Sequence, residues 1–300
     1  MHFSTVLNRD GGTLRTTDLD SFSARIRATL KASGHTCSIN IVEGKQVQSA
    51  LEKAAREDGV DVVMAGGGDG TVSTAAAILR HTERALAVLP AGTMNLFARS
   101  LGIPLDLDAA VSAFATGAIR RVDTATVNGQ PFIHQYSLGM HAKMVRYRER
   151  MQYGSRIGKL VASAKAAYWT VLKPPRIRVA LHAGDTEILT TASNIGVTNN
   201  LFGEGHLPYA DDPDGGILGI YVTVARERGE ILRAILNMAL GRWETNDMVE
   251  IHQAKRATLR VHSHLRGQKA VIDGEIQAAE SETEFLIEPG SLKVLVPSQE

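Results

Sequence analysis

Two short glycine-containing segments hold residue types that bind phosphate groups. The first is Ala65-Gly66-Gly67-Gly68-Asp69-Gly70-Thr71, and the second is Pro90-Ala91-Gly92-Thr93-Met94-Asn95. Glycine lacks a Cβ and accepts positive φ angles, so a phosphate can closely approach the backbone N–H groups of such turns. A helix that starts directly after the turn adds the partial positive charge of its N-terminus. Two such turns, with the acidic Asp69 inside the first, indicate nucleotide-dependent phosphate transfer.

Each turn lies between an expected strand and an expected helix. Apolar runs at 60–64 and 85–89 are typical of buried parallel strands, and residues 71–79 are typical of a helix. Other glycine motifs do not fit, because a Walker loop needs a lysine that is missing here and a dinucleotide fingerprint needs glycine where Thr71 stands. The alternative is a βα turn without a ligand, which the entropic cost of so many glycines disfavours.

The first 121 residues alternate between expected strands and helices. Strands are expected at 3–7 and 36–42, and helices at 19–30, 47–54 and 109–115, where apolar residues recur at helical spacing. This order predicts a doubly wound α/β domain with a parallel sheet. Ligands of such sheets bind at the carboxyl ends of the strands, which is where both glycine turns are expected.

The pattern changes after residue 121. Two hairpins are expected, one at 122–138 around Asn128-Gly129 and one at 177–192 around Gly184-Asp185. Further strands are expected at 217–224, 257–261, 270–272 and 285–287, with helices near 143–172 and 227–240. We therefore predict an antiparallel, β-sandwich-like domain over 122–287. The last run, 288–300, is expected to return to the first domain, and a cleft between the domains is the expected active site.

The composition limits the class of protein. The 300 residues are 44% hydrophobic, and the net charge of +1 provides no global field that would select nucleic acid. One cysteine, Cys37, excludes an internal disulfide framework. The first residues lack the features of a signal peptide, and no apolar run reaches the length of a membrane span. We expect a cytoplasmic protein.

Three motifs in this order resemble the diacylglycerol kinase catalytic family. They are Gly67-Gly68-Asp69-Gly70-Thr71, Pro90-x-Gly92-Thr93-x-Asn95 and Asp273-Gly274-Glu275. The family includes soluble bacterial lipid kinases and sphingosine kinases, with NAD kinase and phosphofructokinase as distant relatives. The resemblance covers essentially the whole chain. It implies a phosphofructokinase-like or NAD kinase-like first domain and an ATP-dependent lipid kinase.

The resemblance also implies which residues bind ATP and Mg²⁺. Phosphoryl transfer needs positioning, charge neutralisation by Mg²⁺ and a base for the attacking hydroxyl. The nucleotide phosphates are expected over the two glycine turns. The expected nucleotide-binding residues are Asn8, Gly66, Gly67, Gly68, Gly70, Thr71, Pro90, Gly92, Thr93 and Asn95.

Three acids are expected to be catalytic: Asp69, Asp273 and Glu275. Asp69 would lie beside the phosphates, where it could hold Mg²⁺ or accept the hydroxyl proton. Asp273 and Glu275 alternate along an expected strand end, so both side chains would point to one face. We favour Asp273 and Glu275 for deprotonating the acceptor and Asp69 for the metal–nucleotide side, and the reverse order stays open.

A cluster of acids forms the turn that contains Asp211, Asp212 and Asp214. In related bacterial enzymes the equivalent turn holds a structural Mg²⁺, and clustered carboxylates suit a hard cation. Gly219 replaces a further Asp that is common in the family. The turn is therefore either a structural Mg²⁺ site or an ordinary acidic turn.

Two more positions depart from the family pattern. The usual Asn-Pro-x-[Ser/Ala]-Gly after the first strand is Asn8-Arg9-Asp10-Gly11-Gly12, and Leu96 stands where Asp often follows the Asn of Gly-Thr-x-Asn. The second change could alter the grip on the nucleotide or the polar network on the acceptor side.

Residues 143–178 contain ten basic residues and one acid, Glu149, together with interleaved aromatic residues. This mixture predicts docking on an anionic membrane surface. The alternative is a solvated helix pair whose aromatic rings pack inward. No nucleic-acid-binding motif accompanies the segment.

The first choice of function is an ATP-dependent lipid kinase that acts on diacylglycerol or a related membrane lipid and associates peripherally with the membrane. A second choice is a phosphotransferase like NAD kinase, and a third is a catalytically degenerate nucleotide-binding regulatory protein. The sequence does not select the acceptor lipid. The oligomeric state is also open, and a homodimer is one of its possibilities.

Overall fold

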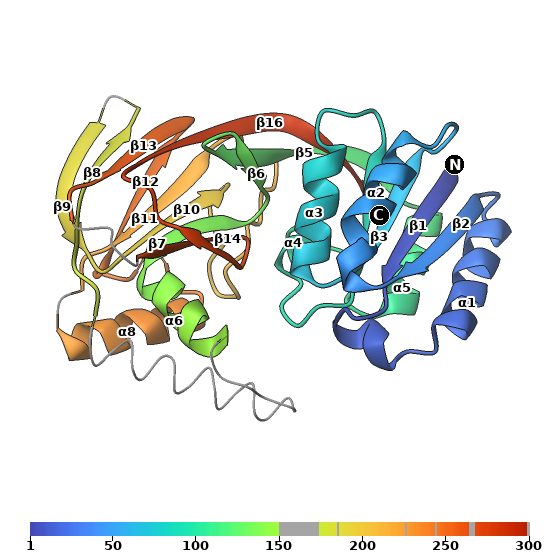
Figure 1. Cartoon of the computed structure of the whole chain (residues 1–300), viewed down its shortest axis with the longest axis horizontal. Helices are drawn as coiled ribbons and strands as arrows, with labels where there is room; N and C mark the ends of the chain where they lie inside the picture. The colour runs from blue at the N-terminus through green and yellow to red at the C-terminus, as the bar shows by residue number, and fades with distance from the viewer. Residues whose placement is uncertain (150–173, 185, 226, 244, 264–267, 299–300) are drawn as a thin grey trace. The chain divides into compact units, whose positions relative to one another are not determined.

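The computed structural model describes residues 1–149, 174–184, 186–225, 227–243, 245–263 and 268–298. The chain divides into two compact units, Met1–Thr124 with Pro289–Glu300 and Ala125–Glu288. Strands β5 (Ala118–Val127) and β16 (Glu282–Val296) contribute residues to both units (Figure 1).

The first unit contains a parallel sheet in the order β2-β1-β3-β4. The end of β16 pairs in parallel with β4, with Val294 opposite Leu86. Every residue of β3 and β4 is buried, which explains their continuous apolar runs. The strand bounds are β1 (His2–Asn8), β2 (Thr36–Val42), β3 (Val62–Gly67) and β4 (Ala85–Pro90).

Helices cover this sheet on both faces. Right-handed crossovers between parallel strands place α1 on one face and α2 and α3 on the other. Accordingly α1 packs with α5, and α2 packs with α3 (Figure 1). The helix bounds are α1 (Leu19–Ala32), α2 (Val47–Arg56), α3 (Asp69–Leu79), α4 (Leu96–Ser100) and α5 (Leu107–Ala115), with 3₁₀ turns at Gly12–Thr16 and Gly44–Gln46. The predicted doubly wound α/β domain is confirmed.

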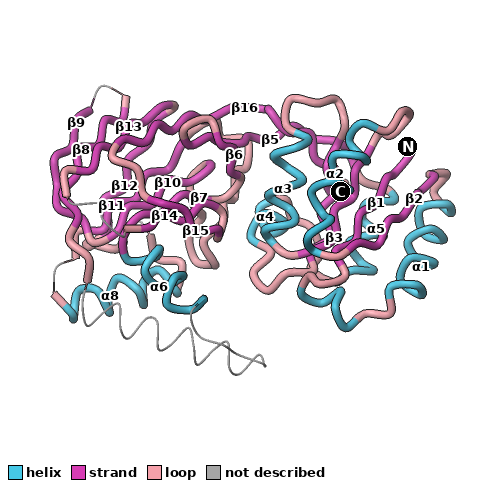
Figure 2. Tube along the Cα trace, viewed as in Figure 1, coloured by secondary structure: helices cyan, strands magenta, loops and turns pink. Residues whose placement is uncertain are grey.

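The second unit is built from two antiparallel layers (Figure 2). One is a six-stranded sheet in the order β12-β11-β10-β7-β14-β15, and the other joins β9-β8-β13 to β16, which also pairs with β5. Apolar side chains from both layers form one core cluster, as in a sandwich. The strands not yet bounded are β6 (Gln130–Phe132), β7 (Gln135–Gly139), β8 (Ile177–Ala183), β9 (Thr186–Ala192), β10 (Asn194–Asn199), β11 (Leu218–Thr223), β12 (Val249–Ala254), β13 (Arg256–Val261), β14 (Lys269–Ile272) and β15 (Glu275–Ala278). The predicted sandwich-like architecture is confirmed.

The expected hairpin at 122–138 is right in its turn and wrong in its second strand. Asn128 and Gly129 have φ angles of 49° and 80° and join β5 to β6, as a type I′ turn requires. After three residues, however, the chain leaves this layer, and β7 pairs with β10 and β14 in the other sheet. Local alternation cannot show such a change of layer, because both strands bury the same kind of residue.

Among the described residues, two helices lie beside the six-stranded sheet, α6 (Met140–Glu149) and α8 (Arg228–Ala239). Ala142 and Val145 of α6 pack against Val271 of β14. The part of the expected helical region at 150–172 lies outside the described residues.

Candidate functional site

Three loops meet at the carboxyl ends of β1, β3 and β4. The sheet order changes direction between β1 and β3, and the crevice at such a switch point is where open α/β sheets bind ligands. Strand β3 ends at Gly67, Gly68 is the N-cap residue of α3, and α3 begins at Asp69. Strand β4 ends at Pro90, and α4 begins at Leu96. Both expected turns therefore stand where the sequence placed them.

Hydrogen bonds join the three loops into one network. Asn8 Nδ2 at the end of β1 donates to Thr71 Oγ1 at 3.1 Å. The Ala91 N–H donates to the Gly67 carbonyl at 3.0 Å, and the Thr13 N–H donates to the Ala91 carbonyl at 2.8 Å. Thr13 and Ala91 take part through backbone atoms, which no residue type reveals, so neither was among the expected nucleotide-binding residues.

The glycines allow the loop backbones to approach one another. A Cβ added to Gly92 would lie 3.0 Å from Gly68 Cα and 2.7 Å from Asn95 Oδ1. Added to Gly67 it would collide with the Thr71 side chain, and added to Gly66 it would lie 2.6 Å from Leu7. At Gly68 the nearest atom would be Gly92 Cα at 3.7 Å, so that position is roomy in the protein itself. Of these four glycines, Gly68 is the one where the absence of a side chain leaves open space.

Asn95 shapes the second turn. It adopts the left-handed conformation, with φ of 50°. Its Oδ1 accepts from the Gly92 N–H at 2.8 Å, and its Nδ2 donates to the carbonyls of Pro90 and Gly92 at 3.2 and 3.1 Å. An asparagine side chain supplies both donor and acceptor for these bonds, and it tolerates positive φ better than most residues.

Asp69 connects the two turns. Its carboxylate accepts from the backbone N–H groups of Asn95 at 3.3 Å and Leu96 at 3.0 Å. The contribution of Leu96 is thus a backbone group, so the loss of the usual Asp side chain there leaves this bond intact. Asp69 is half-buried, and Gly70 and Thr93 are exposed at the same end of the sheet.

Asp273 and Glu275 belong to the other unit, and their geometry corrects the expected strand end. Asp273 and Gly274 form the turn between β14 and β15, with φ angles of 46° and 91°, so Asp273 and Glu275 do not alternate along one strand. The Asp273 carboxylate accepts from three backbone N–H groups at 2.9 to 3.0 Å, those of Ile133, His134 and Gln135. Glu275 is exposed at the first position of β15. Asp273 therefore holds the loop between β6 and β7, while Glu275 faces solvent.

The acidic turn at 211–214 does not form a compact group of ligands. Asp211, Asp212 and Asp214 are exposed, and Asp211 Oδ1 lies 2.9 Å from His206 Nε2. Across the residues that the structure describes, no three His, Cys, Asp or Glu side chains gather closely enough to hold a metal ion. The structural Mg²⁺ at this turn therefore stays a prediction.

Two departures from the family pattern have local structural causes. Gly219 lies in β11, and a Cβ there would be 2.5 Å from Thr198 Oγ1 and 3.0 Å from the Tyr221 ring, so an Asp would not fit without displacing them. The Arg9 N–H donates to the Val42 carbonyl at 2.9 Å, a bond that a proline at this position could not make.

The basic segment 143–178 is described at its two ends. Lys143 and Arg146 are half-buried on α6, and Arg176 and Arg178 are exposed at the start of β8. Its basic residues from Arg150 to Lys173, and His264 farther along the chain, lie outside the described residues. Within the described part of the chain, no helix is long and apolar enough to cross a membrane.

Comparison with known families agrees with this architecture. The diacylglycerol kinase catalytic domain matches residues 2–127. The YegS C-terminal NAD kinase beta sandwich-like domain matches residues 135–296, more than half of the chain. The chain belongs to the diacylglycerol kinase catalytic-domain family. The resemblance that the three motifs carry is thereby confirmed.

Individual relatives share only a limited part of their sequence with this chain. Lipid kinase YegS of Escherichia coli K12 is 38% identical over 105 residues, which cover 34% of this chain and 35% of that protein. An uncharacterised protein of Synechocystis is 26% identical over 96% of this chain and 67% of its own. A crystal structure of a diacylglycerol kinase from Bacillus anthracis has a TM-score of 0.73, covers 98% of this chain and 96% of its own, and is 18% identical, a likeness that shows the fold.

Proposed function

We propose that this protein is an ATP-dependent lipid kinase, which transfers the γ-phosphate to a hydroxyl of diacylglycerol or a related membrane lipid. The observation that carries the proposal is the network at the carboxyl ends of β1, β3 and β4. There two glycine turns pack backbone against backbone beside the N-terminus of an eleven-residue helix, α3. Backbone N–H groups and the helix dipole then face the place of the triphosphate.

The arrangement fits a nucleotide bound with Mg²⁺. Gly68 leaves space at the α3 N-terminus that a Cβ would fill, and Asp69 lies one residue away. Mg²⁺ in kinases is usually held by one or two carboxylates, several waters and the phosphates themselves, so a single acid suffices on the protein side. Asp69 would hold the metal, which would neutralise charge on the transferred phosphate.

On the acceptor side the two acids have different roles. Asp273 is engaged by three backbone N–H groups and fixes the turn that precedes Glu275. Glu275 is the exposed carboxylate, and we assign to it the proton of the attacking hydroxyl. The acceptor oxygen forms a bond to the γ-phosphorus, the bond from that phosphorus to the bridging β–γ oxygen breaks, and ADP leaves with the electron pair.

The test is transfer of labelled phosphate from ATP·Mg²⁺ to a panel of lipids in mixed micelles, with NAD as a separate acceptor. Asp69→Asn is the inactive variant, and Asp58→Asn, an exposed acid of the first unit, is its matched control. A labelled lipid that disappears with Asp69→Asn alone supports the proposal and identifies the acceptor. Label on NAD alone would favour a phosphotransferase like NAD kinase. No transfer by protein that binds ATP would favour a regulatory nucleotide-binding protein.

A further inference from the structure

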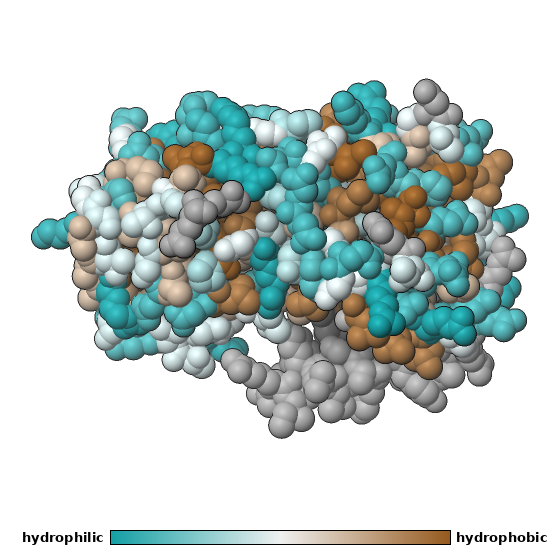
Figure 3. All heavy atoms as spheres, turned by 180° about the vertical axis from the view of Figure 1, so that it is seen from behind, coloured by the Kyte–Doolittle hydropathy of each residue, from teal (hydrophilic) through white to brown (hydrophobic). Residues whose placement is uncertain are grey.

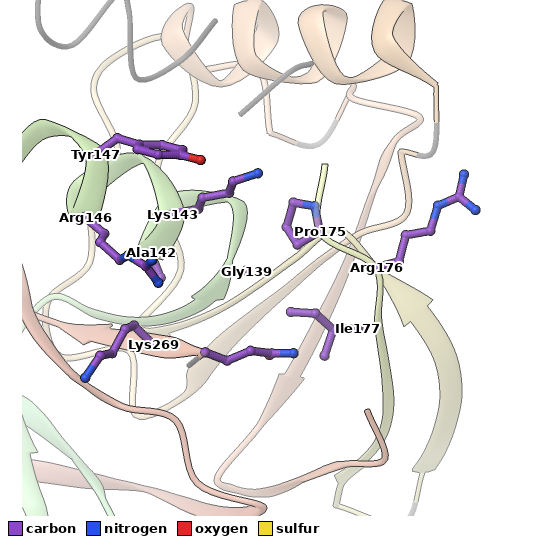
Figure 4. A pocket seen from close by; sticks show the side chains of 10 residues that line it. Gly139, Ala142, Lys143, Arg146, Tyr147, Pro175, Arg176, Ile177 and Lys269 are labelled. Atoms are coloured by element: carbon purple, nitrogen blue, oxygen red, sulfur yellow. The ribbon is translucent and has the colours of Figure 1, made fainter. Parts of the chain in front are cut away.

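A cavity in the second unit is lined by basic side chains. It has a volume of about 290 Å³ and lies between α6, the segment that leads into β8 and the start of β14 (Figure 4). Four of its ten described lining residues are basic and none is acidic. The ten residues are Gly139, Ala142, Lys143, Arg146, Tyr147, Pro175, Arg176, Ile177, Gln268 and Lys269. Lys269 lies far along the chain from the basic segment 143–178, so the sequence did not associate it with this group.

The side chains of this cavity suit a phosphate group. Lys143 and Tyr147 project from α6, with the Lys143 ammonium 5.7 Å from the centre of the Tyr147 ring, while Arg176 points away from them at the rim (Figure 4). Lysine and arginine donate charge-assisted hydrogen bonds to phosphate oxygens, and an anion in this cavity would lie near several such side chains at once. Tyr147 and the buried Ile177 add an apolar wall.

The size of the cavity limits its ligand. At about 290 Å³ it lies at the lower end of the roughly 300–1,000 Å³ of small-molecule sites. It has room for a phosphate headgroup with a few further atoms. The acyl chains of a phospholipid would have to remain outside.

An apolar stripe lies on the neighbouring helix. Leu232, Leu236 and Leu240 follow one another at four-residue spacing along α8 and its end, and they are 62%, 57% and 49% exposed. On the inward side, Ile231 is buried and packs against Met140, the first residue of α6. Helices α6 and α8 are therefore neighbours, and apolar atoms are visible at the lower margin of this unit in Figure 3, the level at which Figure 1 draws α8.

We propose that the basic cavity binds the phosphate headgroup of an anionic phospholipid, while the leucine stripe of α8 enters the adjacent acyl region of the same bilayer. Basic and apolar groups side by side on amphipathic elements match the two layers of a membrane surface. A second copy of this chain is a poorer occupant, because a symmetric contact would bring the same cations together. The inference concerns attachment to the bilayer and does not require the phosphate transfer proposed above.

The first experiment is flotation of the full-length protein, without ATP, on phosphatidylcholine vesicles with or without phosphatidylglycerol. We expect recovery on the anionic vesicles. Each cation removed from a membrane-facing site weakens binding by about fivefold, so Lys143→Gln with Lys269→Gln should lose roughly 25-fold. Lys53→Gln, an exposed lysine of α2, is the matched control and should bind as the unaltered protein does.

The second experiment tests the leucines. Leu232→Ser with Leu236→Ser should lower vesicle binding at least about tenfold, because their apolar surface no longer enters the bilayer. Leu189→Ser on β9 is the control, since Leu189 is 70% exposed but lies on another element. Melting curves of all variants separate lost binding from lost folding.

A third measurement distinguishes a lipid headgroup from a free phosphate compound. Equilibrium dialysis with glycerol 3-phosphate should show saturable binding that Lys143→Gln with Lys269→Gln abolishes and Lys53→Gln preserves. Equal recovery on neutral and anionic vesicles, or equal behaviour of the cavity and control lysine variants, would overturn the proposal. Glycerol 3-phosphate binding without any vesicle binding would overturn the membrane part and indicate a soluble phosphate ester. Asp69→Asn should bind vesicles normally, so failure of the kinase assay and failure of this proposal are distinguishable.

Discussion

The backbone N–H of Leu96 donates to Asp69 Oδ1 at 3.0 Å, across two separate βα turns. The acid of the first glycine turn thus also caps the helix that follows the second. Because one carboxylate holds both turns in register, its removal is expected to affect nucleotide binding through geometry as well as through charge.

The two glycines at the closest approach of the turns should respond differently to alanine. Gly68→Ala places a methyl group where the nearest protein atom is 3.7 Å away, so we expect stability within about 0.5 kcal/mol of the unaltered protein and a KM for ATP raised at least about tenfold. In Gly92→Ala the added Cβ would lie 2.7 Å from Asn95 Oδ1. This variant should therefore also lower the unfolding free energy by about 1–3 kcal/mol, in addition to raising the KM for ATP. Urea unfolding and ATP titration measure the two effects. Gly229→Ala, with no atom within 4 Å of the added Cβ, is the control, and an unchanged KM in Gly68→Ala would contradict the assignment.

Asn95→Asp tests the amide that shapes the second turn. The acceptor for the Gly92 N–H is kept, but the donor to the Pro90 and Gly92 carbonyls is lost and a negative charge is added. We expect a loss of about 1–3 kcal/mol in unfolding free energy and weaker ATP binding, because the new charge repels the phosphates. Asn40→Asp on the exposed side of β2 is the matched control. Equal stability of the two variants would show that the amide donor is not needed.

Asp273 and Glu275 should separate into a structural and a catalytic residue. Asp273→Ala leaves three backbone N–H groups without their acceptor and should lower the unfolding free energy by about 1–3 kcal/mol. Glu275→Gln should change stability by less than about 0.5 kcal/mol and lower kcat at least about a hundredfold. Urea unfolding and labelled phosphate transfer are measured on both. Full activity in Glu275→Gln would exclude it as the base.

The burial of Tyr136 should make the stability of the protein depend on pH. Burial raises the pKa of Tyr136 to about 12, and its ring packs edge-on against Phe285 at 4.9 Å. The unfolded chain ionises near pH 10, so between about pH 10 and 12 the unfolded state binds fewer protons than the folded state. The contribution of neutral Tyr136 to the unfolding free energy is therefore complete below about pH 10. It is lost as the pH rises to about 12, which lowers the unfolding free energy by roughly 2–3 kcal/mol. Tyr136→Phe should remove this part of the decline when urea unfolding is compared at pH 9 and 11.5, values chosen to bracket about pH 10. Parallel declines in both proteins would contradict the prediction.

Local patterns predicted most of the first unit. The strand expected at 36–42 is β2, Thr36–Val42, and the helix expected at 71–79 is contained in α3. These elements follow from periodicity and glycine positions within a few residues, and the parallel order then places both glycine turns at one edge of the sheet.

What the sequence alone determined is the pair of glycine turns at the ends of two strands, the α/β and sandwich-like architecture, and the family. The tertiary structure decided which groups meet. Asp273 is held by the Ile133 N–H, 140 residues away along the chain, and Lys269 joins Lys143 around one cavity. Such pairings depend on how strands change layers and which backbone groups need partners after packing, and no local period of two or 3.6 residues encodes that choice.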